Sequence, residues 1–443
     1  MAKTPLFDAL QNYIENDMSR FHMPGHKGVL PVPLGQAAMY DVTEIAGTDS
    51  LYEASGAIAE TEKIYSEIYG TKASVLSAGG STLCIQAMLA SVLSPGEKIV
   101  CGREVHTSAV NTMALIGAEP VWVYPDMDTE TGMMTELDPE KIKEALAENT
   151  DAKAVYITSP NYFGIMPDIK AIAAICHSFG VPLLVDNAHG AHLKFLPSSL
   201  HPIDLGADIC TDSLHKSLPV LTGGAMLHIN NEKYVPAAKA KMALFGSTSP
   251  SYLIMLSCDM AIDYIKNNAA SGIENACKEI ARLKKLAVKS GFALPHGNIE
   301  PMRLVLGFWK MGYTKSEFAC VLRENKTEPE YLGEYFCVLL AGEANSEKDF
   351  LRIRHIIETL PKRQALAAEY SEPCIPKVKM PLRDAVFAEF ERIDIDNSTG
   401  RTAAGMITPC PPGIPVVVPG EEIVNSMLPL IKSYGILHIN VVK

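Results

Sequence analysis

The sequence lacks the marks of a secreted or membrane protein. Its 10 cysteines include no Cys-x-x-Cys pair and no metal-ligand spacing, so we expect neither a disulfide framework nor a bound metal. The N-terminus has no apolar segment of the signal-peptide kind, and no uninterrupted apolar run is long enough to span a bilayer. We therefore predict a soluble cytoplasmic protein whose cysteines are mostly small buried thiols.

Positive charge is also scarce. The chain has 39 Lys and Arg against 51 Asp and Glu, a net charge of −12, which argues against nucleic acid or an anionic membrane as its main partner. A small cationic ligand is compatible with this balance. With 443 residues, 47% of them hydrophobic, the chain is long enough for two domains with sizeable cores.

Residues 1–55 predict an N-terminal arm. Apolar spacing favours an amphipathic helix over residues 1–20. His22 and His26 are four residues apart, but the Pro-Gly pair between them breaks a helix, so we do not expect a zinc pair. Residues 41–53 are acidic and form either a solvated segment or an arm over a site.

From residue 56 the pattern alternates between helix and strand. The expected strands cover residues 73–77, 98–102, 120–124, 153–159, 181–186 and 207–210. Such alternation predicts an α/β fold, in which a mostly parallel sheet carries helices on both faces. We assign residues 56–291 to this large domain and residues 292–443 to a smaller C-terminal α+β domain.

Polar side chains gather where the expected strands end. The clusters are Gly79–Thr82, Arg103–His106, Thr158–Tyr162, Asp186–His189 and Ser213–Lys216. Because ligands of parallel α/β sheets bind at the carboxyl ends of the strands, we expect these clusters to form one site.

The run Ala-Gly-Gly-Ser-Thr predicts a phosphate cradle at the start of a helix. Gly80 lets the backbone approach an anion closely. Ser81 and Thr82 supply hydroxyls beside free N–H groups and the positive end of the helix dipole. An ordinary helix N-cap explains the same residues equally well.

Asp186 follows a buried apolar run, so its carboxylate needs a partner. A protonated pyridine nitrogen is one candidate, because the ion pair would keep the ring protonated and make it an electron sink. A helix-capping aspartate is the alternative. His189 and His106 lie at neighbouring strand ends and could contact or stack on a flat ring, although a lone histidine is more often structural.

Lys216 ends the last cluster. Alone, it would be read as a solvated surface lysine. Beside an anion-binding site it is a candidate Schiff-base lysine, whose amine attacks an aldehyde cofactor. A phosphate cradle, a ring-nitrogen acid, a stacking imidazole and this lysine together predict a pyridoxal 5′-phosphate (PLP) site.

With these residues in place, the sequence resembles the fold-type I, PLP-dependent Orn/Lys/Arg decarboxylases, in a short form without the N-terminal receiver-like domain. The shared motifs are FHMPGHKG (21–28), DVTEIAGTDSLYE (41–53), AGGST (78–82), the His-x-Ser at His106, SPNYFG (159–164), VDNAHG (185–190), the Ser-x-His-Lys ending at Lys216, and CPPGIP…PGE (410–421). They span nearly the whole chain.

The resemblance implies a role for each candidate residue. Lys216 would carry the cofactor, Asp186 would pair with the pyridine nitrogen, and His106 would stack on the ring, with His189 as a further catalytic residue. The phosphate would be held by Ser81, Thr82, Ser213 and His215, beside Gly80.

For the substrate, the resemblance implies a carboxylate near the distal cation, and Glu330 falls at that position. The expected reaction is α-decarboxylation of arginine, lysine or ornithine, with arginine ranked first, to the amine and carbon dioxide. The family builds its site at a homodimer interface, so we expect a homodimer or higher homo-oligomer with shared active sites.

Two other functions stay open. Transamination is one, since Arg383, Arg392 or Arg401 could clamp an α-carboxylate; a non-catalytic regulatory protein of the same fold is the other. The chain also departs from the family pattern near the expected substrate pocket, at Asn161, Lys326-Thr327 and Cys410.

Overall fold

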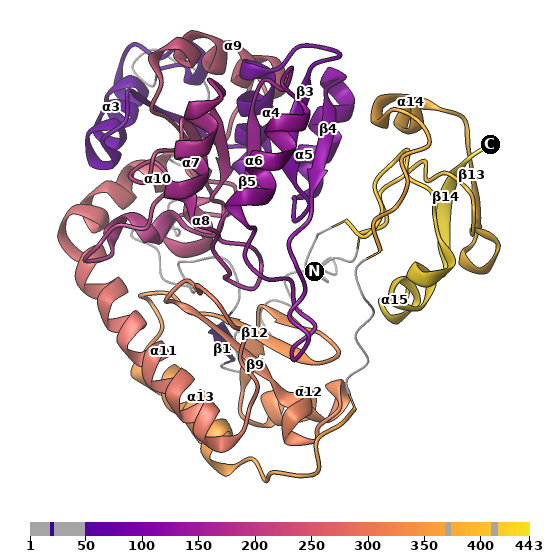
Figure 1. The fold of residues 1–443 in the computed structure, drawn as a ribbon. Coiled ribbons are helices and arrows are strands. Elements are labelled where there is room, and N and C mark those ends of the chain that lie inside the picture. Colours follow the sequence, from indigo (N-terminus) through magenta and orange to yellow (C-terminus); the bar gives the residue numbers. More distant parts are fainter. Residues whose placement is uncertain (1–17, 22–48, 368–373, 409–414) are drawn as a thin grey trace, which may run out of the picture.

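The computed structural model (Figure 1) describes residues 18–21, 49–367, 374–408 and 415–443. Most of the expected N-terminal helix lies outside these residues, as does Cys410. Where the helix prediction can be tested it was wrong, because β1 (Ser19–Phe21) is a short strand. It pairs in parallel with β10 (Thr327–Pro329), and this pairing overrides the local helical periodicity.

Asp49 marks the start of the main described segment and caps a helix. Its carboxylate accepts the backbone N–H groups of Gly56 and Ile58, at 2.8 and 3.0 Å, at the start of α3 (Ala57–Tyr69). Burial opposes ionisation, but these backbone hydrogen bonds prevail and lower the pKa of Asp49 to about 2. This acidic residue therefore serves the fold.

A seven-stranded sheet in the order β2-β8-β7-β6-β5-β3-β4 forms the centre of the large unit. Its strands are β2 (Ala73–Ser77), β3 (Lys98–Gly102), β4 (Glu119–Val123), β5 (Val155–Thr158), β6 (Leu183–Asp186), β7 (Ile209–Asp212) and β8 (Ala225–Ile229). Within this sheet only β8 is antiparallel to its neighbours. The predicted α/β fold with a mostly parallel sheet is confirmed.

The strand expected over residues 207–210 extends further than its apolar run. Thr211 and Asp212 continue β7 because they pair with Leu227 and Met226 of β8. Two polar residues that the sequence pattern assigns to a loop are therefore fully buried in the sheet.

Helices cover both faces of the sheet (Figure 1). One face packs against α4 (Gly80–Val92), α5 (Thr107–Ile116) and α9 (Val235–Phe245). The other packs against α6 (Pro139–Glu148) and α7 (Ile169–Ser178), with α3 and α10 (Tyr252–Tyr264) in an adjoining cluster. Local capping sets where these helices start. In α6, for example, Pro139 is the first helical residue, and the side chain of Asp138 before it accepts the N–H of Glu140.

The long helix α11 (Ala270–Ser290) leads from the large unit to a second sheet (Figure 1). That sheet is antiparallel, in the order β11-β12-β9. Its elements are β9 (Arg303–Gly307), β11 (Tyr331–Leu332), β12 (Phe336–Leu340), α12 (Lys315–Glu324) and α13 (Glu347–Thr359). The helices bury their apolar sides on it around Phe308 and Phe318, whose rings stack at 4.6 Å.

A separate hydrophobic cluster belongs to the C-terminal residues. It is built on α14 (Leu382–Phe387), β13 (Phe390–Asp394), α15 (Leu428–Ser433) and β14 (His438–Val442), with β13 and β14 antiparallel. Arg103, at the end of β3, reaches this unit through a buried two-pronged ion pair with Glu421, at 2.8 and 2.9 Å. The division at residues 291/292 stays a prediction: the cluster under the second sheet includes residues of α11, which lies before this boundary, and the C-terminal residues form a cluster of their own.

Six of the nine described cysteines are buried and none of the nine forms a disulfide. This agrees with the prediction of small buried thiols. Among the described residues, we find no helix with both the length and the apolarity needed to cross a membrane.

Candidate active site

The five polar clusters lie at one edge of the large sheet. Each follows the carboxyl end of β2, β3, β5, β6 or β7, and these strands all run in the same direction. The expectation that they form one site is therefore supported by the sheet topology.

The candidate phosphate cradle begins α4. Gly80 has φ +68°, a conformation that side-chain-bearing residues rarely adopt, and its N–H donates to the Gly223 carbonyl at 2.8 Å. The Ser81 and Ser213 hydroxyl oxygens are 2.6 Å apart, and both residues are buried. Thr82 is exposed one position further along the helix. The predicted cradle thus has two hydroxyls from different strand ends at one helix N-terminus.

His215 lies in the short helix α8 (Leu214–Ser217), which follows β7. Its Nδ1 is 3.1 Å from the Gly224 carbonyl oxygen, so the ring is fixed with Nδ1 as donor. Its contact with a phosphate stays a prediction.

Asp186 is the last residue of β6 and is buried. One carboxylate oxygen accepts the Ala188 N–H at 3.1 Å, and the other accepts the Tyr156 hydroxyl at 3.3 Å. Burial, reinforced by the nearby Asp186 charge, raises the pKa of Tyr156 well above its usual value, so the phenol stays a donor. Two neutral donors hold the carboxylate and leave it without a cationic partner among these contacts.

Lys216 and His189 are in direct contact. The Lys216 Nζ is 3.0 Å from the His189 Nε2. Burial lowers the pKa of Lys216, an effect that the negative charges of Asp186 and Glu330 oppose. Burial also lowers the pKa of His189 well below its ordinary value, and the Lys216 charge adds to this. The imidazole is therefore held in its neutral form beside the lysine.

His106 is the N-cap of α5. Its Nδ1 accepts the Ser108 N–H at 3.2 Å and lies 2.7 Å from the Ser108 hydroxyl. These bonds tie down one edge of the ring, while the residue as a whole is exposed at the sheet edge. An anchored ring with an open surface is what stacking on a flat cofactor requires.

Glu330 is connected to this group through Tyr162. The Tyr162 hydroxyl donates to Glu330 at 3.0 Å, and the Tyr162 ring meets the His189 ring edge-on at 5.6 Å. Contacts therefore run within one chain from the candidate substrate carboxylate of Glu330 through Tyr162 and His189 to the candidate cofactor lysine.

Sequence reasoning missed Arg303, a fully buried residue beside the site. Its guanidinium bonds Glu300 at 3.1 Å and the Tyr162 carbonyl, and lies 3.5 Å from the His189 Nδ1. Arg303 therefore helps to hold Tyr162 and His189 in place. A charged residue at the start of the apolar run Leu-Val-Leu-Gly was the available signal.

Two departures from the family pattern lie in the described residues. Asn161 donates to both carboxylate oxygens of Glu104, at 3.0 and 3.1 Å. Burial raises the pKa of Glu104 to about 7, although the Asn161 hydrogen bonds oppose the rise. Lys326 adopts φ +51° just before Thr327 enters β10.

Comparison with known proteins decides the relationship. The model described as "Orn/Lys/Arg decarboxylase, major domain" matches residues 4–304, and that described as "Orn/Lys/Arg decarboxylase, C-terminal domain" matches residues 365–435. The chain belongs to the Orn/Lys/Arg decarboxylase family. It is 32% identical to an arginine decarboxylase of Halalkalibacterium halodurans, over 97% of this chain and 93% of the relative.

Two further similar proteins are also named as decarboxylases of basic amino acids. An arginine decarboxylase of Bacillus anthracis is 30% identical over 97% of this chain and 93% of its own length. The crystal structure of the Francisella novicida lysine decarboxylase superposes with a TM-score of 0.77 at 16% identity, over 100% of this chain and 79% of that one. The fold is that of the fold-type I PLP-dependent enzymes.

Proposed function

We propose that the protein is a PLP-dependent decarboxylase of a basic amino acid, with arginine ranked first and lysine and ornithine as the alternatives. The observation that carries the proposal is the convergence of Lys216, Asp186 and the Ser81–Ser213 pair at one sheet edge. Family membership, and relatives named arginine decarboxylase, support the reaction and the ranking of arginine.

The residues at this edge fit PLP. Lys216 offers an amine for the aldehyde, and Asp186 offers a buried carboxylate that accepts hydrogen bonds from the neutral Ala188 N–H and Tyr156 hydroxyl. Ser81 and Ser213 offer hydroxyls at a helix N-terminus for the phosphate, with Thr82 and His215 beside them. When bound, PLP supplies an electron sink that makes carboxylate loss from Cα possible.

The protein's own groups would handle the protons. The lowered pKa of Lys216 increases the fraction of neutral amine that can attack an aldehyde. His189, whose Nε2 lies 3.0 Å from the Lys216 Nζ, would hold the amine in place as a neutral hydrogen-bond partner. His106 would cover one face of the ring and keep water from it.

Glu330 would bind the distal cation of the substrate. Tyr162 orients its carboxylate, and Arg303 in turn fixes the Tyr162 backbone. A carboxylate oriented in this way can pair with a guanidinium or an ammonium group. Discrimination between the diamino acids then rests on the distance from Lys216 to Glu330 and on head-group shape.

Two of the three arginines that left transamination open have other contacts. Arg383 bonds the Ala114 carbonyl at 3.2 Å, near the C-terminus of α5 and so at the opposite end of that helix from His106. Arg401 pairs with Glu391 at 2.7 Å in the C-terminal unit. These two positions favour decarboxylation over transamination.

We further propose a homodimer or higher homo-oligomer with shared active sites, as in the family, and a reducing cytoplasmic location where the cysteines stay unpaired. Such a reaction would supply an amine for polyamine biosynthesis. Light scattering of the purified protein tests the assembly; a monomer with full activity would reject shared sites.

A product screen tests the reaction. The PLP-reconstituted protein is incubated separately with arginine, lysine and ornithine, and released carbon dioxide and the amine are measured by mass spectrometry. We expect stoichiometric amine and carbon dioxide from one of the three. A keto acid formed only with an added acceptor would establish transamination instead.

A further inference from the structure

A buried polar cluster lies behind the candidate active site. It consists of Asn187, His201, Cys210, Asp212 and His228, hereafter the Asp212 cluster, and all five residues are fully buried. Asp186 pairs with Thr211 across β6 and β7, so Asp212, one residue on, projects to the other face of the sheet. Among the described residues, no side-chain hydrogen bond of the cluster reaches a group assigned above to cofactor or substrate.

The donors of the cluster converge on one carboxylate. Asn187 Nδ2 donates to Asp212 Oδ1 at 2.6 Å, and His201 Nε2 lies 3.0 Å from Oδ2. His228 Nε2 approaches the same Oδ2 at 3.4 Å. Burial alone would favour protonation, but the contacts with His201 and His228 lower the pKa of Asp212 far below its ordinary value. The sheet thus holds a fully buried negative charge.

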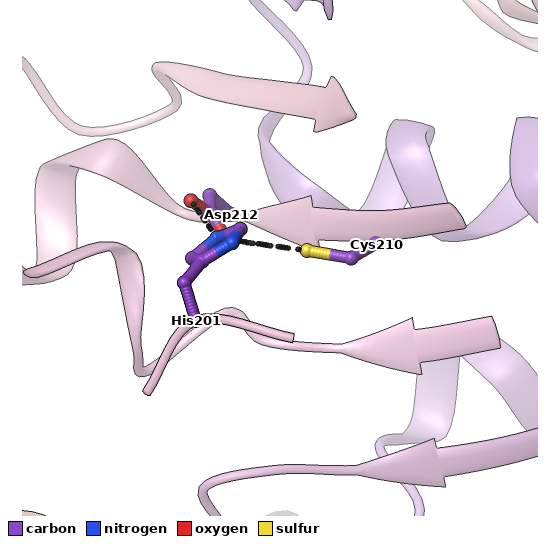
Figure 2. Close-up of side chains that lie close together, drawn as sticks. All are labelled: His201, Cys210 and Asp212. Atoms are coloured by element: carbon purple, nitrogen blue, oxygen red, sulfur yellow. Dashed lines mark hydrogen bonds and ion pairs between the residues drawn. The ribbon is translucent and has the colours of Figure 1, made fainter. Parts of the chain in front are cut away.

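His201, Cys210 and Asp212 are also spaced as a metal site would be (Figure 2). The Cys210 Sγ is 3.8 Å from His201 Nε2 and 3.6 Å from Asp212 Oδ1. However, His201 Nδ1 accepts the Ile203 N–H at 3.4 Å, so the ring proton is on Nε2 and points at Asp212. A metal needs that nitrogen bare, and the contacts therefore fit a hydrogen-bonded network better.

Asn187 connects this network to the active-site turn, residues 186–190. Its carbonyl accepts the Gly190 N–H at 2.7 Å, and its side chain fills the turn so closely that a Cβ at Gly190 would meet Oδ1 at 2.1 Å. Ala188, which donates to Asp186, and His189, which contacts Lys216, belong to the same turn.

Asp212, at the other end of the bond from Asn187, also lies next to candidate active-site residues. Asp212 is followed directly by Ser213, whose hydroxyl meets Ser81, and by the helix that carries Lys216. One buried carboxylate therefore ties the turn that carries Asp186 and His189 to the strand end that carries Ser213 and Lys216.

We propose that Asp212, acting through Asn187, is a positioning residue that sets His189 and Asp186 against Lys216. The proposal rests on the function proposed above. It assigns no contact with substrate or cofactor to Asp212 or Asn187, and it predicts that loss of the Asn187 bond misplaces the turn rather than emptying the site.

The test compares two variants that each remove one donor to Asp212. Asn187→Ala cuts the connection to the turn, whereas His201→Ala removes a donor outside it. We expect both to lower the midpoint of thermal unfolding. Only Asn187→Ala should shift the visible absorption of bound PLP and its pH dependence, and lower kcat about 10- to 100-fold at saturating PLP with a smaller change in KM.

The outcomes of these measurements either support the positioning role of Asp212 or overturn it. Normal absorption and kcat in Asn187→Ala, or equal changes in His201→Ala, would reduce the cluster to a stability element and overturn the proposal. If Asn187→Ala does not fold, Asn187→Ser is measured against the same control. One equivalent of zinc in the purified protein would show that His201, Cys210 and Asp212 bind a metal, and would overturn the proposal. Wild-type protein without PLP on Lys216 would reject the proposed function instead.

Discussion

Glu330→Gln separates the charge of the candidate substrate carboxylate from its shape. The amide keeps an oxygen for the Tyr162 hydroxyl, which donates to Glu330 at 3.0 Å, so the local structure should persist. What is lost is a hydrogen bond between charged partners, which contributes about 1.5–3 kcal/mol. We therefore expect kcat/KM for the dibasic substrate to fall about 10- to 150-fold.

The assay compares substrates as well as variants. kcat/KM is measured for arginine, lysine and the uncharged, straight-chain norleucine, at saturating PLP. Norleucine should respond little to Glu330→Gln, because it has no distal cation. Tyr162→Phe is the matched variant: it keeps the carboxylate and removes only the donor that orients it, so a smaller loss than in Glu330→Gln is expected.

Equal losses for charged and uncharged substrates would refute this reasoning. They would show that Glu330 supports the site in general, by holding Tyr162, whose ring packs against the His189 ring. Another group would then bind the distal cation.

Three further predictions concern the cofactor site and its supports. Asp186→Ala should keep PLP, because the phosphate groups are untouched, but lower kcat by about 10²–10³-fold or more; an unchanged rate would remove the electron-sink argument. Glu104→Gln should change the pH dependence of stability: with the pKa of Glu104 raised from 4.5 to about 7, the folded protein keeps a proton that the unfolded chain has lost, so wild-type stability falls as pH rises between these values. The variant should therefore gain on the order of 3 kcal/mol over wild type at pH 8 and nothing at pH 4, measured by urea unfolding, and parallel pH profiles would contradict this. Glu421→Gln should cost about 3–5 kcal/mol, because it leaves the buried Arg103 guanidinium without its anion; Trp122, 5.0 Å from that guanidinium, reports the transition by fluorescence, and an unshifted midpoint would count against a structural role for the pair.

The sheet was predictable because its strands are short apolar runs with clear boundaries. Residues 98–102 form β3 exactly as expected, since a Pro-Gly turn precedes the run and polar residues follow it. The strand β8 was not foreseen, and its antiparallel direction cannot be read from periodicity, which is the same in both directions. β7 was cut short because Thr211 and Asp212 look like loop residues until β8 pairs with them.

The cofactor end of the site was foreseen better than its supports. Strand ends are local in sequence, so Asp186 and Lys216 could be picked out by the residues that precede them. Arg303 and Tyr162 act through contacts between chain segments 141 residues apart, and no local pattern encodes such a contact. The bond from Asn187 to Asp212 likewise exists only because β6 and β7 are neighbours.

Attachment of the cofactor is the most direct test of the whole account. The protein is reconstituted with PLP, reduced with borohydride and digested, and the modified peptide is identified by mass spectrometry. We predict one PLP per chain, on the peptide that contains Lys216, and no label in Lys216→Ala. Label on a different lysine, or protein that stays colourless after reconstitution, would contradict the account.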